Sequence, residues 1–262
     1  PIYTFTLTVN NTNDAPNLTG FSMSDHTAVA TANEDSYYVH DTSAHFNDID
    51  VGDVLTYSAT LSGGAALPSW LSINTTTGVL SGTPTNTDSG AIDITVTATD
   101  TSNTSVSDTY TLTVNNTNDT PTLISTIADS SIDESAAYSH DASVHFNDVD
   151  TGDTLTYSAT LSGGATLPSW LSINTTTGVL SGTPTNSNAG SINVVVTATD
   201  TSNASVSDTF ALTVNNVNDT PTLISTIADS SINESSAYSP DASVHFNDVD
   251  TGDTLTYSAT LS

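Results

Sequence analysis

Hydrophobic and polar residues alternate along several segments of the chain. Residues 155–161 place Leu155, Tyr157, Ala159 and Leu161 at every second position, and residues 192–198 and 206–214 repeat the pattern. Successive side chains of an extended strand point to opposite faces, so each segment predicts a β-strand with one buried face. No stretch of ten or more residues has helical periodicity. The pattern therefore predicts an all-β fold class.

Turn signals separate the alternating segments. Gly-Gly at 63–64, Asn-Thr-Thr-Thr-Gly at 74–78 and Gly-Thr-Pro at 82–84 recur in the later part of the chain. Their spacing, about 8 to 12 residues, is typical of a β-sandwich. We expect about seven strands in each sandwich.

The chain repeats itself. Residues 57–86 return at 157–186 with one change, Ala66 to Thr166, and the same sequence begins again at Tyr257. A period of 100 residues is that of a small β domain, whereas solenoid repeats are about 20 to 50 residues long. The marker Val-Asn-Asn-x-Asn-Asp-x-Pro occurs at 9–16, 114–121 and 214–221. Because Asn, Asp and Pro end strands, we place boundaries near these markers.

These boundaries divide the chain into four segments. Residues 1–13 are predicted to be the last strand of a preceding repeat, 14–118 and 119–218 to be complete repeats, and 219–262 to be the N-terminal part of a further repeat. The first complete repeat is five residues longer than the second, with the extra residues between Asp14 and Glu34. We expect the chain to be an excerpt from a longer array of domains.

Charge restricts the possible partners. The chain has no Lys or Arg and 29 Asp plus Glu, although roughly thirty Lys plus Arg are usual at this length. Nucleic acid is disfavoured as a partner because phosphate binding depends on Lys and Arg. No apolar run of 18 residues occurs, so we expect no membrane insertion. The chain also has no Cys, so a stabilising cross-link would have to be a metal ion.

Acidic residues recur at fixed spacing. A Glu at 34, 134 and 234 precedes by 14 residues the first Asp of an Asp-x-Asp-x-Gly-Asp motif, and a late Asp ends Val-Thr-Ala-Thr-Asp at 100 and 200. Residues i and i+2 of an extended loop lie on one side, so Asp-x-Asp can bind a single ion. Calcium takes six to eight oxygen ligands and tolerates irregular geometry. The pattern therefore predicts Ca²⁺ as the cofactor, although a solvated acidic surface without a specific ion would also contain such residues.

Four motifs in a fixed order carry a family resemblance. They are Phe-x-Asp-x-Asp-x-Gly-Asp, Trp-Leu-x-Ile-Asn-x-x-Thr-Gly, Val-Thr-Ala-Thr-Asp and Asn-x-Asn-Asp-x-Pro. Together they resemble the cadherin-like domain of the dystroglycan type, which recurs in tandem in large bacterial surface adhesins. The resemblance implies Ig-like or cadherin-like Greek-key β-sandwiches arranged end to end as a rod. It also implies an extracellular protein, either at a cell surface or secreted.

The resemblance also implies the metal ligands. In cadherins, ions lie at domain junctions and are bound by a Glu of the upstream domain, the linker, and the Asp-x-Asp and late Asp of the downstream domain. The ligands implied at the central junction are Glu34, Asn116, Asn118, Asp119, Asp148, Asp150 and Asp200. Those at the first junction are Asn11, Asn13, Asp14, Asp48, Asp50 and Asp100. Those at the last junction are Glu134, Asn216, Asn218, Asp219, Asp248 and Asp250.

One segment departs from the cadherin pattern. Cadherins supply two further ligands from an Asp-Arg-Glu tripeptide, and here residues 82–88 and 182–188 contain no such tripeptide. Asp88 is a candidate substitute in the first repeat, whereas Asn188 would be a poorer one. We therefore expect fewer ions per junction than the three usual in cadherins.

The function expected from these features is that of a non-enzymatic spacer in an extracellular adhesin or surface fibre, made rigid by Ca²⁺ at the linkers. Its partners would be Ca²⁺, neighbouring repeats of the same chain, and other copies in lateral or fibre self-association. The alternative is a carbohydrate-binding accessory region of a secreted enzyme, with Tyr37 and Tyr38 as an aromatic platform. Trp70 and Trp170 are interpreted as core residues. No activated nucleophile or paired acid and base is evident, so we expect no catalytic activity.

Overall fold

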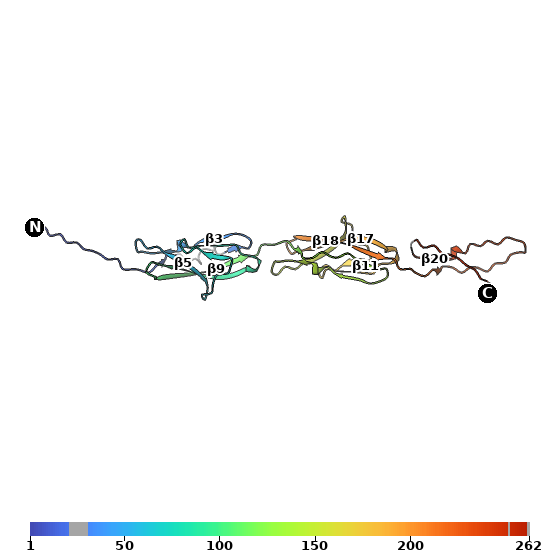
Figure 1. The fold of residues 1–262 in the computed structure, drawn as a ribbon, viewed down its shortest axis with the longest axis horizontal. Coiled ribbons are helices and arrows are strands. Elements are labelled where there is room, and N and C mark those ends of the chain that lie inside the picture. The colour runs from blue at the N-terminus through green and yellow to red at the C-terminus, as the bar shows by residue number, and fades with distance from the viewer. Residues whose placement is uncertain (21–30, 251, 261–262) are drawn as a thin grey trace. The chain divides into compact units, whose positions relative to one another are not determined.

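The computed structural model describes residues 1–20, 31–250 and 252–260. These residues form strands and three-residue 3-10 helices, which confirms the all-β fold class. The chain contains two compact units, the first made of residues 1–119 with 149–152 and the second of 120–148 with 153–262 (Figure 1). Part of the segment to which we assigned the five extra residues, 21–30, lies outside the described residues.

The first unit contains a sandwich of two main sheets. The four-stranded sheet has the order β2 (Thr31–Asn33), β9 (Ser105–Asn115), β8 (Gly90–Thr99) and β5 (Thr56–Leu61). The three-stranded sheet has the order β3 (Tyr38–Asp41), β7 (Val79–Gly82) and β6 (Leu71–Ile73). A separate two-stranded sheet pairs β1 (Asn17–Leu18) with β4 (Phe46–Asn47). Strand β2 runs parallel to β9, and the other pairs are antiparallel.

The second unit repeats this topology. Its four-stranded sheet has the order β11 (Ser130–Asp133), β18 (Ser205–Asn215), β17 (Gly190–Thr199) and β14 (Thr156–Leu161). Its three-stranded sheet has the order β12 (Tyr138–Asp141), β16 (Val179–Gly182) and β15 (Leu171–Ile173). The short pairs are β10 (Thr122–Leu123) with β13 (Phe146–Asn147), and β19 (Thr222–Leu223) with β20 (Phe246–Asn247). The main sheets of each sandwich thus have the seven strands that the turn spacing predicts.

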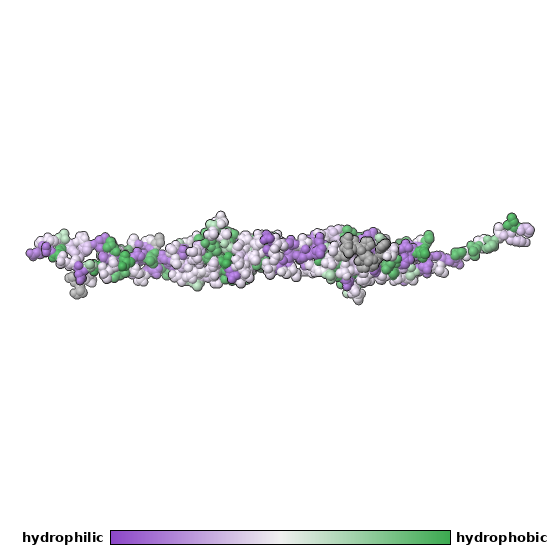
Figure 2. All heavy atoms as spheres, turned by 180° about the vertical axis from the view of Figure 1, so that it is seen from behind, coloured by the Kyte–Doolittle hydropathy of each residue, from purple (hydrophilic) through white to green (hydrophobic). Residues whose placement is uncertain are grey.

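The core of each sandwich lies between its two main sheets. In β17 the alternate residues Val194, Val196 and Ala198 are fully buried, as the sequence alternation predicts. Trp70 and Trp170 are half-buried and pack against the two cores, which confirms their interpretation as core residues. The face of the described residues that Figure 2 shows is mostly hydrophilic or neutral, and hydrophobic residues form small patches on it.

A glycine allows two strands of the smaller sheet to approach closely. Gly82 pairs with Leu71, and a Cβ atom at Gly82 would lie 1.7 Å from the carbonyl oxygen of Trp70. At Gly182 the corresponding distance to the Trp170 carbonyl oxygen is 1.8 Å. No side chain fits at such distances, so both positions require Gly.

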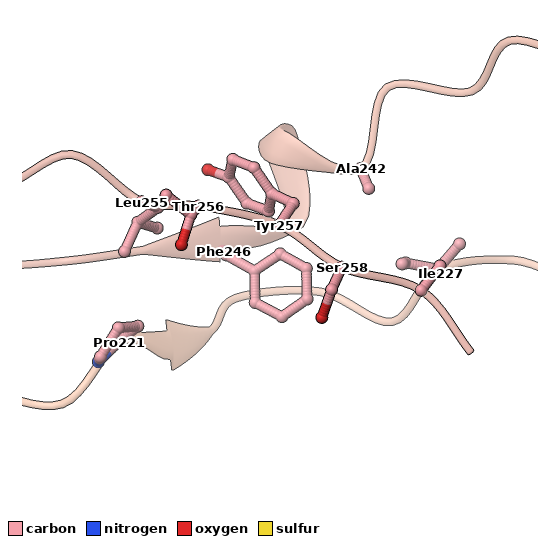
Figure 3. A pocket seen from close by; sticks show the side chains of 9 residues that line it. Pro221, Ile227, Ala242, Phe246, Leu255, Thr256, Tyr257 and Ser258 are labelled. Carbon is pink, nitrogen blue, oxygen red and sulfur yellow. The ribbon is translucent and has the colours of Figure 1, made fainter.

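The two ends of the chain expose residues that are buried in the complete repeats. Ile227 and Tyr257 line an open hollow with Pro221 and Phe246 (Figure 3) and are 51 % and 49 % exposed. Ile127 and Tyr157, their counterparts in the second repeat, are at most 8 % exposed. Residues 1–16 form no strand and expose an apolar series that matches the end of β18 in sequence: Phe5, Leu7 and Val9. Neither residues 1–13 nor the described part of residues 219–262 forms a complete sandwich, so their assignment to further repeats stays a prediction.

Candidate metal centre

Buried carboxylates mark the ends of the sandwiches. All seven are at most 8 % exposed: Glu34, Asp50, Asp100, Glu134, Asp150, Asp200 and Asp250. Burying a charged group is unfavourable unless it is paired with an opposite charge and hydrogen-bonded. The sequence contains no Lys or Arg that could pair with them. These carboxylates therefore depend on hydrogen-bond donors and on cations from outside the chain.

The linker binds the second Asp of each Asp-x-Asp motif in the same way. The backbone N–H groups of Asp14, Asp119 and Asp219 donate to Oδ2 of the three aspartates over 2.8, 2.7 and 2.6 Å. The side-chain amides of the Asn residues three positions earlier donate to Oδ1 over 2.7, 3.1 and 3.1 Å. These donors are Asn11, Asn116 and Asn216, and the acceptors are Asp50, Asp150 and Asp250. Each carboxylate is thereby hydrogen-bonded to its linker at two points.

The first unit contains the group that we name the Glu34 centre. It consists of Glu34, Asp119 and Asp150, with one carboxylate oxygen from each lying within 4.8 Å of the others. Glu34 follows β2, and its Oε1 accepts the backbone N–H of Thr117 over 2.7 Å. Two oxygens bound to one Ca²⁺ at about 2.3 to 2.6 Å lie at most about 5 Å apart. The three carboxylates therefore fit a single calcium ion.

The second unit contains an equivalent group, the Glu134 centre. Glu134, Asp219 and Asp250 each place one oxygen within 4.8 Å of the others. Glu134 Oε1 accepts the backbone N–H of Val217 over 2.7 Å, but Oε2 is buried without a hydrogen-bond partner. A buried carboxylate oxygen without a donor is costly, and a bound cation would supply its partner. This donor set also fits Ca²⁺.

A third group, the Asp100 group, lies within the first unit and consists of Asp48, Asp53 and Asp100. Oδ2 of Asp48 and Oδ2 of Asp53 are buried without hydrogen-bond partners. The pKa of Asp100 lies below its ordinary value, chiefly because the Thr104 hydroxyl donates to it. Desolvation raises this pKa, while donation from Asn13 and from the backbone of Thr104 and Ser102 lowers it further. In the third copy Asp248, Asp250 and Asp253 form a similar group.

The remaining predicted ligands have other surroundings. The amides of Asn13, Asn118 and Asn218 donate to the carbonyl oxygens of the adjacent Asp residues over 2.9, 2.7 and 2.7 Å, which shapes the linker turn. Asp200 is buried and accepts the N–H groups of Ser202 and Ala204, each over 2.8 Å. Asp148 is half-buried in the loop after β13.

The sequence did not lead us to predict two kinds of residue at these carboxylate groups. The amide of Asn86 donates to Asp119, and that of Asn186 donates to Asp250 over 2.9 Å. Asp53 is the third Asp of its motif, and strand parity alone would place it opposite Asp48. The positive φ of Gly52, 103°, reverses the chain before Asp53 and accounts for the difference. Recurrence of Asn and Asp at these positions in both repeats was the available signal.

Two further expectations from the sequence have different outcomes. The Asp88 carboxylate accepts the N–H and the hydroxyl of Thr85 over 2.9 and 2.7 Å and so caps a short 3-10 helix, and its role as a substitute ligand stays a prediction. The expected aromatic platform is wrong, since Tyr37 is 69 % exposed whereas Tyr38 is 7 % exposed and belongs to the core. The hydroxyl groups of Tyr38 and Tyr110 lie 3.3 Å apart inside that core.

Comparison with protein families and solved structures bears on the fold. A family model with the description "Putative Ig domain" (He_PIG) matches residues 20–115 and 120–215. Mouse Cadherin-23 EC22-24 is similar with a TM-score of 0.54 and 19 % identity over 81 % of this chain and 70 % of that chain. Drosophila N-cadherin EC1-4 has a TM-score of 0.50 and 17 % identity over 78 % of this chain and 50 % of that chain. At these identities the similarity shows the fold alone, and it confirms tandem Ig-like, cadherin-like repeats.

Other comparisons add little. An endo-fucoidan hydrolase from glycoside hydrolase family 107 is 24 % identical over 80 % of this chain, which spans 30 % of the hydrolase, with a TM-score of 0.32. Such a low score supports no argument about activity. A search of curated proteins found no match. Among the described residues no helix is long and apolar enough to cross a membrane.

Proposed function

Because the chain belongs to the Putative Ig domain family, with two tandem copies of a cadherin-like fold, we propose that it is a non-enzymatic spacer of an extracellular adhesin or surface fibre. In this proposal Ca²⁺ binds at the linkers and makes them rigid. The observation that supports it most is the Glu134 centre, where three carboxylates converge and one buried oxygen has no donor. Ig-like and cadherin-like repeats are typically extracellular and non-catalytic, which agrees with this role.

The donor set favours calcium among the divalent ions. Carboxylate oxygens are hard ligands, and the amide oxygens of neighbouring Asn residues are compatible with the same ion. Magnesium requires near-ideal octahedral geometry and keeps several waters, whereas calcium accepts irregular sites. The ion would offset the mutual repulsion of carboxylates whose oxygens lie within 4.8 Å of one another.

Binding would act on the linker directly. Asp119 and Asn116 belong to the linker, and both already donate to Asp150. An ion held by Glu34, Asp119 and Asp150 would join the end of β2 to this linker and to the loop containing Asp150. The linker would then lose conformational freedom, so a flexible string of domains would become stiffer. Each repeat would add roughly 35 Å of reach, because its longest strands have 10 and 11 residues at about 3.4 Å each.

The expected affinity suits a protein outside the cell. Extracellular calcium modules have dissociation constants of about 10⁻⁴ to 10⁻³ M. At tenfold excess of the ion, each site would stabilise the folded state by about 1.4 kcal/mol. The sites would fill where calcium is millimolar and remain empty where it is submicromolar.

Calcium titration of the whole chain tests the proposal. We expect added Ca²⁺ to raise the melting temperature and to narrow the distribution of dimensions measured by small-angle scattering. The double substitution of Asp150→Asn and Asp250→Asn should remove most of this response. Asp229→Asn is the matched control because Asp229 is exposed and lies outside the three-carboxylate groups of the described residues. If chelation changed neither the melting temperature nor the dimensions of the wild-type chain, the proposal would be wrong.

A further inference from the structure

The Glu34 and Glu134 centres differ at several positions, and one difference removes a side-chain hydrogen bond to the glutamate. In each centre Oε1 of the glutamate accepts a backbone N–H of the linker over 2.7 Å, from Thr117 in one and Val217 in the other. The second oxygen has different surroundings. Residue 89 is Ser in the first repeat, and its counterpart, residue 189, is Ala.

Ser89 provides a donor that Ala189 lacks. The Ser89 hydroxyl donates to Glu34 Oε2 over 2.7 Å, and Glu34 is fully buried. In the second unit Glu134 is 6 % exposed, and its Oε2 is buried without a hydrogen-bond partner. The missing hydroxyl therefore coincides with the carboxylate oxygen that has no donor.

We propose that the residue at position 89 or 189 determines how strongly each centre depends on its cation, and that the Glu134 centre binds calcium more tightly than the Glu34 centre. This inference rests on the proposed function. Ser89 acts as a positioning residue that partly satisfies Glu34 before an ion arrives. Ala189 leaves that role to the ion.

Burying a charged oxygen without a partner costs free energy. In the ion-free state this cost raises the free energy of the Glu134 centre, and binding of a cation relieves it. At Glu34 the serine hydroxyl has already offset part of the cost, so the ion gains less. A carboxylate oxygen accepts more than one interaction, so Ser89 need not leave when the ion binds. The expected difference in affinity is on the order of tenfold.

The consequence is a graded response to calcium. As the ion concentration falls, the Glu34 centre would lose its ion first and the Glu134 centre later. Without calcium, the first unit would retain more of its stability than the second unit, because Glu34 keeps the Ser89 donor. Two junctions built from nearly the same sequence would therefore loosen at different calcium concentrations.

Reciprocal substitution in the full chain isolates this position. The backbone amides of Thr117 and Val217 report on the two centres in a two-dimensional NMR titration with Ca²⁺. We expect the wild-type midpoint for Val217 to be roughly tenfold lower in Ca²⁺ than that for Thr117. Ala189→Ser should raise the Val217 midpoint by a similar factor, and Ser89→Ala should lower the Thr117 midpoint. Each substitution should leave the other centre unchanged.

The chelated chain provides a second readout. Without calcium, Ala189→Ser should raise the melting temperature of the second unit, and Ser89→Ala should lower that of the first. Ala91→Ser is the matched control, because residue 91 is exposed and its counterpart is naturally Ser191.

Two results would count against the inference, and they are distinguishable. Equal wild-type midpoints that neither substitution moves would overturn the inference while leaving the proposed function intact. Absence of any calcium-dependent shift at both amides would overturn the proposed function, and the inference with it.

Discussion

The first and second repeats share their strand order and most of their sequence, but they satisfy buried polar groups differently. Among the hydroxyl groups of the first repeat that have no counterpart in the second are those of Ser89, Thr104 and Tyr110, replaced by Ala189, Ala204 and Phe210. Each of these hydroxyls makes a hydrogen bond to a buried partner, namely Glu34, Asp100 and Tyr38. The fold is therefore retained without these hydrogen bonds. The number of hydrogen-bond donors at the acidic sites, by contrast, differs between the two repeats.

The comparison separates two kinds of position. Positions that allow close approach of paired strands are the same in both repeats, as Gly82 and Gly182 are, because backbone geometry leaves no alternative. Positions beside the carboxylates vary, because a hydroxyl, a backbone N–H or a cation can each serve as the partner of an oxygen. Variation at such positions changes ion dependence without changing topology.

The largest expected effect on stability comes from substituting the glycine that the two repeats share in the smaller sheet. Gly82→Ala and Gly182→Ala should each destabilise their own repeat by about 3 kcal/mol or more, because the new Cβ would overlap a Trp carbonyl oxygen. Trp70 and Trp170 are the only Trp residues, one in each complete repeat, so chains with Trp170→Phe or Trp70→Phe report on one repeat at a time. Chemical denaturation followed by Trp fluorescence measures the loss. Val51→Ala, at a fully exposed position, is the control.

Unequal effects would contradict the equivalence of the two repeats. If Gly82→Ala unfolded the first repeat while Gly182→Ala was tolerated, the strands of the two smaller sheets would not approach each other in the same way.

A smaller difference in stability between the two repeats should appear at alkaline pH. Burial raises the pKa of Tyr110, with the nearby Tyr38 raising it further. The unfolded state would then lose its proton near pH 10 while the folded state keeps it, so stability falls as pH rises through about 10. Phe210 has no such proton, so the first repeat should lose more stability than the second between pH 8 and 10.5.

Tyr110→Phe should remove most of this excess alkaline loss, at a cost of about 1 kcal/mol at neutral pH from the lost hydrogen bond. Denaturation curves of the first repeat at both pH values measure the two effects together. An unchanged alkaline loss in the variant would show that Tyr110 is not its source.

Sequence pattern predicts the fold better than it predicts the site. Alternation identifies β17, whose ten residues give a long period-two signal. It does not reveal the parallel pairing of β2 with β9, because β2 has three residues and no detectable period. The family resemblance anticipates Glu34, Asp119 and Asp150 as ligands, which the structure brings within ligand distance of one another.

The rest of the site depends on tertiary contacts. Ser89 and Asn86 lie between β7 and β8, far in sequence from Glu34 and Asp119, and approach them only in the folded repeat. In a chain rich in Ser, Thr and Asn, a hydroxyl or amide at one position carries no local signal. The position of the Asp53 side chain depends on the turn at Gly52, which interrupts the strand period.

The smallest expected effect concerns the Asp100 carboxyl group. The Thr104 hydroxyl is the main cause of its lowered pKa, and Ala204 provides no hydroxyl to Asp200. Thr104→Ala should therefore raise the pKa of Asp100 toward its ordinary value. The stabilisation linked to this group is present above the unfolded pKa and is lost as pH falls through the folded pKa, so the variant should lose less stability on acidification, and the loss should end at a higher pH.

Carboxyl-detected NMR titration of the Asp100 side chain measures this pKa directly. Ala204→Thr is the reciprocal variant, which would introduce a hydroxyl group at the position in the second repeat that corresponds to Thr104. No change in Asp100 after Thr104→Ala would mean that the backbone N–H donors alone set its pKa.

The central claim is that the buried carboxylate centres bind divalent cations. Equilibrium dialysis of the full chain against Ca²⁺ tests it most directly, with the Asp150→Asn and Asp250→Asn double variant and the Asp229→Asn control measured alongside. The account predicts calcium bound by the wild-type chain and the control with dissociation constants of about 10⁻⁴ to 10⁻³ M, and most of this binding lost in the double variant. Equal calcium uptake by all three chains would contradict it.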